Sequence, residues 1–169
     1  LAKAGYCPII LERGEEADKR QKTVENFWKN GVLDPESNVQ FGEGGAGTFS
    51  DGKLNTLVKD PYGRNHEVLK RFVAAGAPEI IYQQKPHLGT DVLVGIVEKM
   101  RHEIEDMGGK FCFRSKVTDL IFENGALKEV EINNSEKIPA EVCVLALGHS
   151  ARDTFEMLQK RGVYMERLP

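Results

Sequence analysis

The sequence is poor in cysteine and has no long apolar run, and each shortage excludes a class of protein. Its three cysteines, Cys7, Cys112 and Cys143, form no C-x-x-C pair, which argues against a disulfide framework and against a structural zinc site. The longest apolar run, residues 142–147, has six residues, whereas a transmembrane helix needs about 20. We therefore expect a cytoplasmic protein without a membrane-spanning segment.

Positive charge is also too scarce for a protein that binds nucleic acid. Lys and Arg together number 23 and Asp and Glu 26, so the net charge at pH 7 is −3. Binding to a phosphate backbone requires an excess of basic residues, which is absent here. The four histidines show neither an H-x-x-x-H nor an H-E-x-x-H spacing, so we expect no metal site.

Glycine, by contrast, is abundant and concentrated in one segment. It makes up 17 of the 169 residues, and four of the 17 lie within residues 42–47. Glycine is favoured where the backbone needs unusual dihedral angles or where another group must approach closely. Residues 39–54 show neither helical nor strand periodicity, and so long a loop in a compact domain is typical of a functional segment.

Hydrophobic periodicity and turn residues predict the elements of the rest of the chain. We expect helices over residues 15–30, 65–75, 91–107 and 151–161, with Thr90 capping the third and Ser150 and Asp153 forming a capping box at the fourth. We expect strands over residues 6–12, 111–116, 117–123, 127–133 and 137–147, with an antiparallel meander among the middle ones. The first strand, the cysteines and Trp28 of the first helix are expected to be buried.

The first twelve residues predict part of a nucleotide-binding unit. Leu1 to Gly5 are typical of the last turn of a helix whose beginning is missing, so we expect an internal piece of a longer protein. A helix, a strand and an acidic strand end form the second half of a βαβ dinucleotide-binding unit, in which the acidic side chain accepts hydrogen bonds from a ribose hydroxyl. Glu12 occupies the position of that acidic residue. Strands also often end on charged surface residues, so Glu12 alone does not decide between a ribose-binding residue and a surface residue.

Longer motifs carry a resemblance to a known family. The stretch SNVQFGEGGAGTFSDGKL at residues 37–54, preceded by IILERG at residues 9–14, resembles a family of uncharacterised bacterial FAD-dependent dehydrogenases. PHLGTD at residues 86–91 and LALGHSARDT at residues 145–154 are also similar to that family, so the resemblance covers nearly the whole chain. Members of this family are similar in fold to the glutathione-reductase-like flavoproteins, and their full chains are much longer than this one.

The resemblance implies a fold and an activity. The fold would be α/β, an FAD/NAD(P)-binding Rossmann-like three-layer fold with a β-meander, in which the strand at residues 111–116 lies beside the strand of Glu12. It would be incomplete, because the first strand and the G-x-G-x-x-G turn are absent. We expect residues 1–60 to form a partial FAD-binding segment, residues 61–109 a helical segment, and residues 110–169 a return to the FAD-binding domain. The activity would be flavin-mediated hydride transfer on a small-molecule substrate, with NAD(P) as an expected electron donor.

The resemblance also assigns cofactor-binding residues. Glu12 is expected to hold the adenosine ribose of FAD with Arg13 and Gly14 beside it, and Val117 to contact the adenine through its backbone. The other expected contacts come from the glycine-rich segment and from a strand-to-helix turn: Gly44, Gly45, Ala46, Gly47, Thr48, Ser50, Asp51, Lys53, Gly148, His149 and Ser150. Backbone N–H groups of these segments would approach the pyrophosphate or the flavin, and the side chains would add polar contacts. No catalytic acid or base is assigned.

Two other interpretations remain open. The unit could bind NAD(P) in place of FAD, because an acidic strand end suits the adenosine ribose of either cofactor. The chain could also be a non-catalytic remnant that binds no cofactor, since the phosphate-binding turn is missing. Without the first strand, the edges of the Glu12 strand and of the strand at residues 142–147 would be unpaired, and we expect self-association through them.

Overall fold

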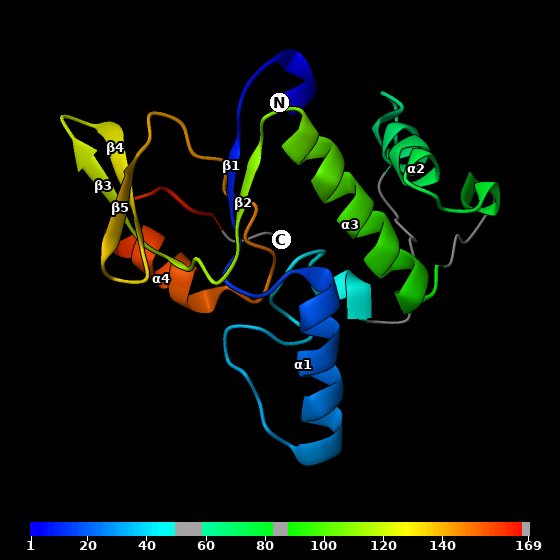
Figure 1. Cartoon of the computed structure of the whole chain (residues 1–169). Coiled ribbons are helices and arrows are strands. Elements are labelled where there is room, and N and C mark those ends of the chain that lie inside the picture. Colours follow the sequence, from blue (N-terminus) through cyan, green and yellow to red (C-terminus); the bar gives the residue numbers. More distant parts are fainter. Residues whose placement is uncertain (50–58, 83–87, 167–169) are drawn as a thin grey trace. The chain divides into compact units, whose positions relative to one another are not determined.

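The computed structural model describes residues 1–49, 59–82 and 88–166, which form a mixed α/β structure (Figure 1). The helices are α1 (Ala17–Asn30), α2 (Arg64–Ala74), α3 (Thr90–Asp106) and α4 (Arg152–Lys160), and short 3₁₀ turns span Ala2–Ala4, Ala46–Phe49 and Glu79–Tyr82. The strands are β1 (Ile9–Leu11), β2 (Lys110–Cys112), β3 (Val117–Glu123), β4 (Ala126–Ile132) and β5 (Glu136–Pro139). The chain divides into two compact units, Leu1–Arg114 and Ser115–Pro169, each described by itself. None of the described helices is long and apolar enough to cross a membrane.

The first unit contains a small parallel sheet made of β1 and β2 (Figure 1). Ile9 pairs with Lys110 and Leu11 with Cys112, and the Glu12 N–H donates to the Cys112 carbonyl at 2.9 Å. The prediction that these two strands lie side by side is therefore confirmed. β1 is shorter and less buried than predicted, with Ile9 53% exposed, because no described strand pairs with its other edge.

Helix α3 joins the two apolar clusters of the first unit. Leu93 and Ile96 belong to the larger cluster, together with Ala75, Ala77, Ile81 and Leu88. Val94 packs with Ala17, Val24 and Phe49. The periodicity of residues 91–107 predicts this helix to within one residue at each end. The predicted Thr90 cap is wrong, because the N-cap is Gly89, without a capping side-chain hydrogen bond, and Thr90 is the first helical residue.

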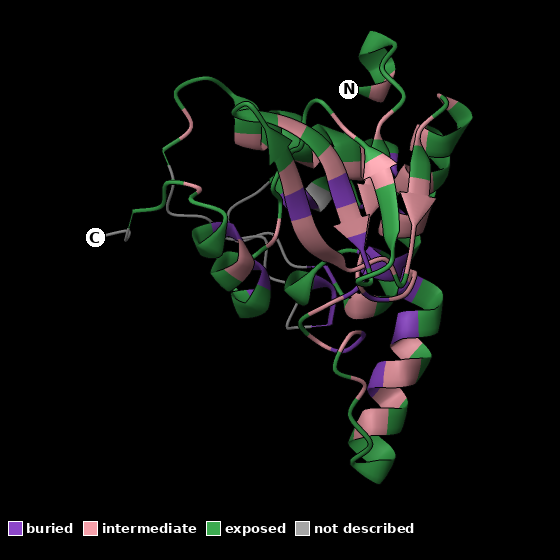
Figure 2. Cartoon of the chain, turned by 90° about the vertical axis from the view of Figure 1, so that its left-hand side faces the viewer, coloured by how far each residue is buried: buried purple, intermediate pink, exposed green. Residues whose placement is uncertain are grey.

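Helix α1 ends where its sequence predicts. Gly31 adopts a φ of 68° and its N–H donates to the Phe27 carbonyl, which is a common way to end a helix. Val24 and Ala17 are buried. The prediction that Trp28 is a core residue is wrong, since its side chain is 62% exposed, and Figure 2 shows how exposure increases towards the end of this helix. Arg20, which has no exposed surface, lies on the buried face of α1.

The second unit is an antiparallel meander with one helix packed on it. The strand order is β3-β4-β5, which confirms the predicted meander. Asn124 and Gly125 make the first hairpin turn with φ values of 51° and 78°, as expected of an Asn-Gly pair. Helix α4 packs against β3, where Arg161 forms an ion pair with Asp119.

The predicted strand at residues 137–147 is largely wrong. Only its first part forms β5, and residues 142–148 have no regular structure. Val142 is 82% and Val144 73% exposed. A continuous apolar run forms a strand only when neighbouring strands and covering layers bury it, and in the described residues no strand pairs with this segment. The capping box is wrong too, because α4 begins one residue later than predicted, with Ala151 as its N-cap.

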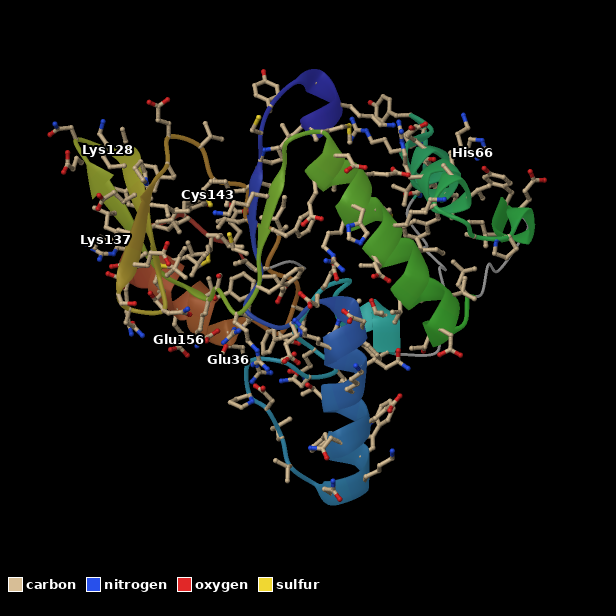
Figure 3. All side chains as sticks on the ribbon, viewed as in Figure 1. Glu36, His66, Lys128, Lys137, Cys143 and Glu156 are labelled. Carbon is tan, nitrogen blue, oxygen red and sulfur yellow. The ribbon has the colours of Figure 1, made fainter. Side chains whose placement is uncertain are left out.

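The three cysteines are free thiols. Cys7 and Cys143 are exposed and Cys112 is partly buried, so the prediction that all three are core residues is wrong for Cys7 and Cys143. The side chain of Cys143 is labelled in Figure 3. Cys7 lies before the first residue of β1, and Cys143 lies in the irregular segment that follows β5. Self-association through unpaired strand edges stays a prediction.

Candidate functional site

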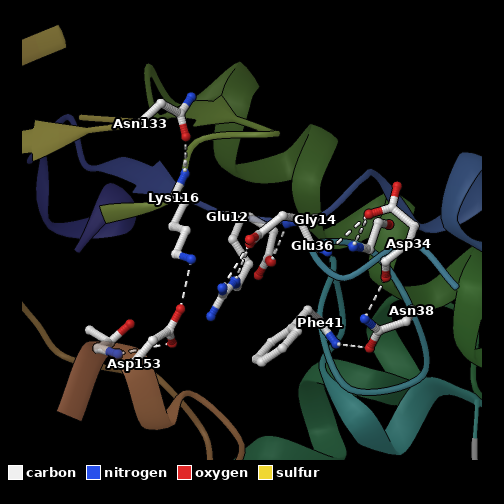
Figure 4. A network of polar contacts seen from close by, with 12 residues as sticks. Glu12, Gly14, Asp34, Glu36, Asn38, Phe41, Lys116, Asn133 and Asp153 are labelled. Carbon is white, nitrogen blue, oxygen red and sulfur yellow. Dashed lines mark hydrogen bonds and ion pairs between the residues drawn. The ribbon is translucent and has the colours of Figure 1, made fainter. Parts of the chain in front are cut away.

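The carboxylate of Glu12 is oriented by the backbone of two glycines, of which Figure 4 labels Gly14. Glu12 follows the last residue of β1, and its Oε1 accepts hydrogen bonds from the N–H of Gly14 at 2.8 Å and of Gly42 at 3.0 Å. Within residues 1–49, 59–82 and 88–166, its other oxygen, Oε2, accepts no hydrogen bond. The site therefore holds one oxygen in place and leaves the second for another donor.

Gly14 and Gly42 lie so close together that neither position has room for a side chain. A Cβ on Gly14 would be 2.6 Å from the Gly42 Cα and 2.7 Å from its nitrogen. On the other side, a Cβ on Gly42 would be 2.3 Å from the Cδ of Arg20, and Gly42 has a φ of 121°. Close approach of backbone to backbone therefore explains part of the glycine content of this segment.

Arg20 holds the glycine-rich segment from the buried face of α1. Its Nε donates to the Asn38 carbonyl at 2.8 Å, and its Nη1 donates to the carbonyls of Gly42, Glu43 and Gly45 at 3.2, 2.7 and 2.9 Å. Burial lowers the pKa of Arg20 to about 10, against the opposing charges of Glu12 and Glu43. The guanidinium lies 4.7 Å from the centre of the Phe49 ring, and its buried Nη2 has no hydrogen-bond partner among the described residues.

Glu43 joins the same segment to two helices. Its Oε2 accepts the N–H of Ala17, the first residue of α1, at 2.8 Å, and its Oε1 is 3.0 Å from the Nε of Arg101 on α3. Burial raises the pKa of Glu43, while the Ala17 N–H and the charge of Arg101 act in the opposite direction. Glu43 is 6% exposed, so the pair belongs to the interior of the first unit.

Arg13, next to Glu12, is already paired. Its Nε and Nη2 both lie 2.7 Å from the Oε2 of Glu36, and its guanidinium lies 4.1 Å from the centre of the Phe41 ring. The Arg13 side chain is 12% exposed. The positive charge of Arg13 is therefore neutralised by Glu36, although Arg13 directly follows Glu12 in the sequence.

Arg114 connects the turn at residues 34–38 with the segment just before α1. Arg114 lies 2.7 Å from the Oδ2 of Asp34 and 2.9 Å from the Oε1 of Glu15. The hydrogen bond from Arg114 lowers the pKa of Asp34, although burial opposes it. Burial also tends to raise the pKa of Glu15, but hydrogen bonds from Thr23 and Arg114 lower it overall.

These lowered pKa values predict a loss of stability in acid. A carboxyl whose pKa is lower in the folded chain stabilises the fold above its ordinary pKa, and this contribution is lost as the pH falls through the folded value. For Asp34 and Glu15 the loss therefore begins below the ordinary values of 3.8 and 4.5. We expect the Arg114→Gln variant to be about 1 kcal/mol less stable than the unsubstituted chain at pH 7, with a smaller difference at pH 3. Urea unfolding at the two pH values measures this, and an equal difference at both would contradict it.

The other residues predicted to bind a cofactor lie in several places. Gly44, Gly45, Ala46 and Gly47 are exposed, whereas Thr48 is buried. Ser50, Asp51 and Lys53 lie outside the described residues. In the second unit, Val117 is the first residue of β3. Gly148 and His149 are exposed and Ser150 is partly buried, and the strand that was predicted to precede them does not form, so they are not at a strand-to-helix turn.

Four residues that contact the glycine-rich segment or belong to it were not among the predicted cofactor-binding residues: Arg20, Gly42, Glu43 and Arg101. The signal for Arg20 is its spacing. It lies three residues after Ala17 and four before Val24, so a charged residue falls in the apolar stripe of an amphipathic helix. In the described part of the chain, no three His, Cys, Asp or Glu side chains gather in an arrangement that could hold a metal ion.

Comparison with known proteins gives a relative without an assigned function. No family model matches the chain. Over 167 residues the chain is 52% identical to an uncharacterised protein of Clostridium beijerinckii. The match covers 98% of this chain and 31% of the relative, so the chain spans about a third of that protein's length.

Proposed function

We propose that the first unit binds the adenosine part of a dinucleotide, FAD before others, and that the chain is part of an FAD-dependent oxidoreductase with a Rossmann-like fold. The observation that carries this proposal is the Glu12 carboxylate. It lies at the carboxyl end of a parallel strand, where such folds bind the ribose of a dinucleotide. Two backbone N–H groups fix one of its oxygens, and the other is left to accept a hydrogen bond from a ribose hydroxyl.

The surrounding residues fit such a ligand. Gly14 and Gly42 leave no space for a side chain beside the carboxylate, and the exposed backbone of Gly44, Gly45 and Gly47 leaves room for a ligand to approach. The chain's part is to bind and orient the nucleotide. When bound, FAD would supply the hydride-accepting chemistry of an oxidoreductase. The resemblance of residues 9–14 and 37–54 to FAD-dependent dehydrogenases supports the choice of FAD.

NAD is the second candidate ligand, because the same carboxylate suits its adenosine ribose. The ion pair of Arg13 with Glu36 disfavours NADP among nicotinamide cofactors. A 2′-phosphate next to Glu12 would need a cation to balance it, and Arg13 is already neutralised. NAD binding alone, with no bound flavin, would make the chain a nicotinamide-binding module.

Replacing Glu12 tests the proposed function. The Glu12→Gln variant keeps an oxygen for the Gly14 and Gly42 N–H groups but loses the charge, so we expect FAD to bind at least about tenfold more weakly. Glu12→Ala removes both and should bind FAD more weakly still. The measurement is FAD affinity by titration of flavin fluorescence, together with the visible absorbance of the purified protein.

A nearby glutamate provides the control for this test. Glu16 pairs with the exposed side chain of Lys19, so Glu16→Gln changes the net charge equally and should leave FAD affinity unchanged. Equal FAD affinity of the unsubstituted chain and the Glu12→Ala variant would remove Glu12 from the site. An unsubstituted chain that binds NAD but not FAD would favour the second candidate.

A further inference from the structure

We propose that Arg20 is a positioning residue of the nucleotide site: from α1 it holds the glycine-rich segment so that the Gly42 N–H points at Glu12. This inference rests on the proposed function, because it gives Arg20 a part in presenting the carboxylate to the ligand. Arg20 itself has no exposed surface and would not touch the nucleotide.

The hydrogen bonds of Arg20 go to a single stretch of backbone. Four carbonyls between residues 38 and 45 accept from two nitrogens of its guanidinium. A buried arginine is usually balanced by a carboxylate that it contacts directly, whereas among the described residues Arg20 contacts carbonyl oxygens and the ring of Phe49. The planar guanidinium spreads five donors over a fixed fork, whereas a lysine ammonium has three donors on a single nitrogen and cannot reproduce that geometry.

Contacts lead from Arg20 to Glu12 through one residue, Gly42. The Gly42 carbonyl accepts from Arg20 and the Gly42 N–H donates to Glu12. The Gly42 backbone is also confined, with Arg20 on one side and Gly14 on the other, at distances that exclude any added Cβ. A displacement of Arg20 therefore moves Gly42, and with it one of the two donors that orient Glu12.

The conservative variant Arg20→Lys separates positioning from general stability. It keeps a positive charge on α1 but loses the fork that holds the four carbonyls. We expect a folded chain with unchanged helical circular dichroism, in which FAD binds about tenfold more weakly and the Gly42 amide exchanges faster with solvent. Arg71→Lys is the matched control, since Arg71 pairs with Glu67 on the exposed face of α2 and should change neither value.

A double variant tests whether Arg20 acts through Glu12. If it does, adding Arg20→Lys to Glu12→Gln should weaken FAD binding little further. The inference would be overturned if the double variant lost FAD affinity by the product of the two single-variant factors. It would also be overturned if the Gly42 amide of the Arg20→Lys chain were as well protected from exchange as in the unsubstituted chain.

The two proposals can fail separately. If the unsubstituted chain does not bind FAD, the proposed function fails, while exchange of the Gly42 amide still shows whether Arg20 positions this residue. If Arg20→Lys does not fold, nuclear magnetic resonance of the unsubstituted chain decides the matter. Adding FAD should then shift the Arg20 Nε–H and the Gly42 N–H resonances together, and a shift of neither on saturation with FAD would overturn the inference.

Discussion

The Glu43→Ala variant is expected to be about 3–5 kcal/mol less stable than the unsubstituted chain, because it breaks a buried ion pair and leaves its partner behind. Arg101 would lose the carboxylate 3.0 Å from its Nε, and its side chain is only 12% exposed to water. The Ala17 N–H, at the start of α1, would lose its acceptor as well. Urea or thermal unfolding of the first unit measures the effect.

Two further variants show which part of the Glu43 contact matters. Glu43→Gln keeps an oxygen that can accept the Ala17 N–H. It also removes a negative charge whose burial is unfavourable, which is why burial raises the pKa of Glu43. We therefore expect Glu43→Gln to lose less stability than Glu43→Ala. Glu98→Ala is the control, because Glu98 lies 4.0 Å from the same arginine but is 45% exposed, and we expect it to cost less than about 1 kcal/mol. Equal losses for Glu43→Ala and Glu98→Ala would mean that the buried pair contributes nothing special.

Local signals in the sequence predict the elements that depend on local forces. The left-handed conformations of Gly5 and Gly31 end their turns as expected. Asn124 and Gly125 make the predicted hairpin turn, and the spacing of apolar residues in α3 matches its buried face. The parallel pairing of β1 with β2 comes from the family resemblance, since periodicity alone carries no information about which strands are neighbours.

Predictions fail where burial depends on distant parts of the chain. The run at residues 142–147 has the composition of a buried parallel strand, yet Val142 and Val144 are exposed because no described strand pairs with this segment. The prediction that Trp28 is buried fails for a related reason. Its position on α1 suits an apolar face, but the apolar residues of the first unit contact α1 nearer its beginning, at Ala17 and Val24.

The candidate site was half predicted. The place of Glu12 follows from strand and charge pattern, and the glycine count marks residues 42–47 as unusual. The role of Gly42 could not be read from sequence, because it depends on contacts with Gly14, 28 residues away, and with Arg20. Arg20 was missed because a charged residue on a helix is usually exposed, and the carbonyl partners and nearby carboxylates that compensate its burial come from other parts of the chain.

Gly14→Ala is the substitution that should disturb the site most directly. The new Cβ would lie 2.6 Å from the Gly42 Cα, and because that atom belongs to the backbone, the two segments must move apart. We expect a loss of about 1–3 kcal/mol in stability. The separation would also pull the Gly42 N–H away from Glu12, so FAD affinity and protection of the Gly42 amide should fall together.

The matched glycine control is Gly95→Ala on α3. A Cβ on Gly95 would meet no atom within 4 Å, and alanine favours a helix over glycine by about 1 kcal/mol, so this variant should be more stable than the unsubstituted chain. The pair of variants adds the same methyl group with opposite expected signs. If Gly14→Ala were as stable as Gly95→Ala and kept the Gly42 amide protected, the close approach of the two glycines would not be what orients Glu12. The carboxylate would then be held by the strand alone, and the glycine-rich segment would need another explanation.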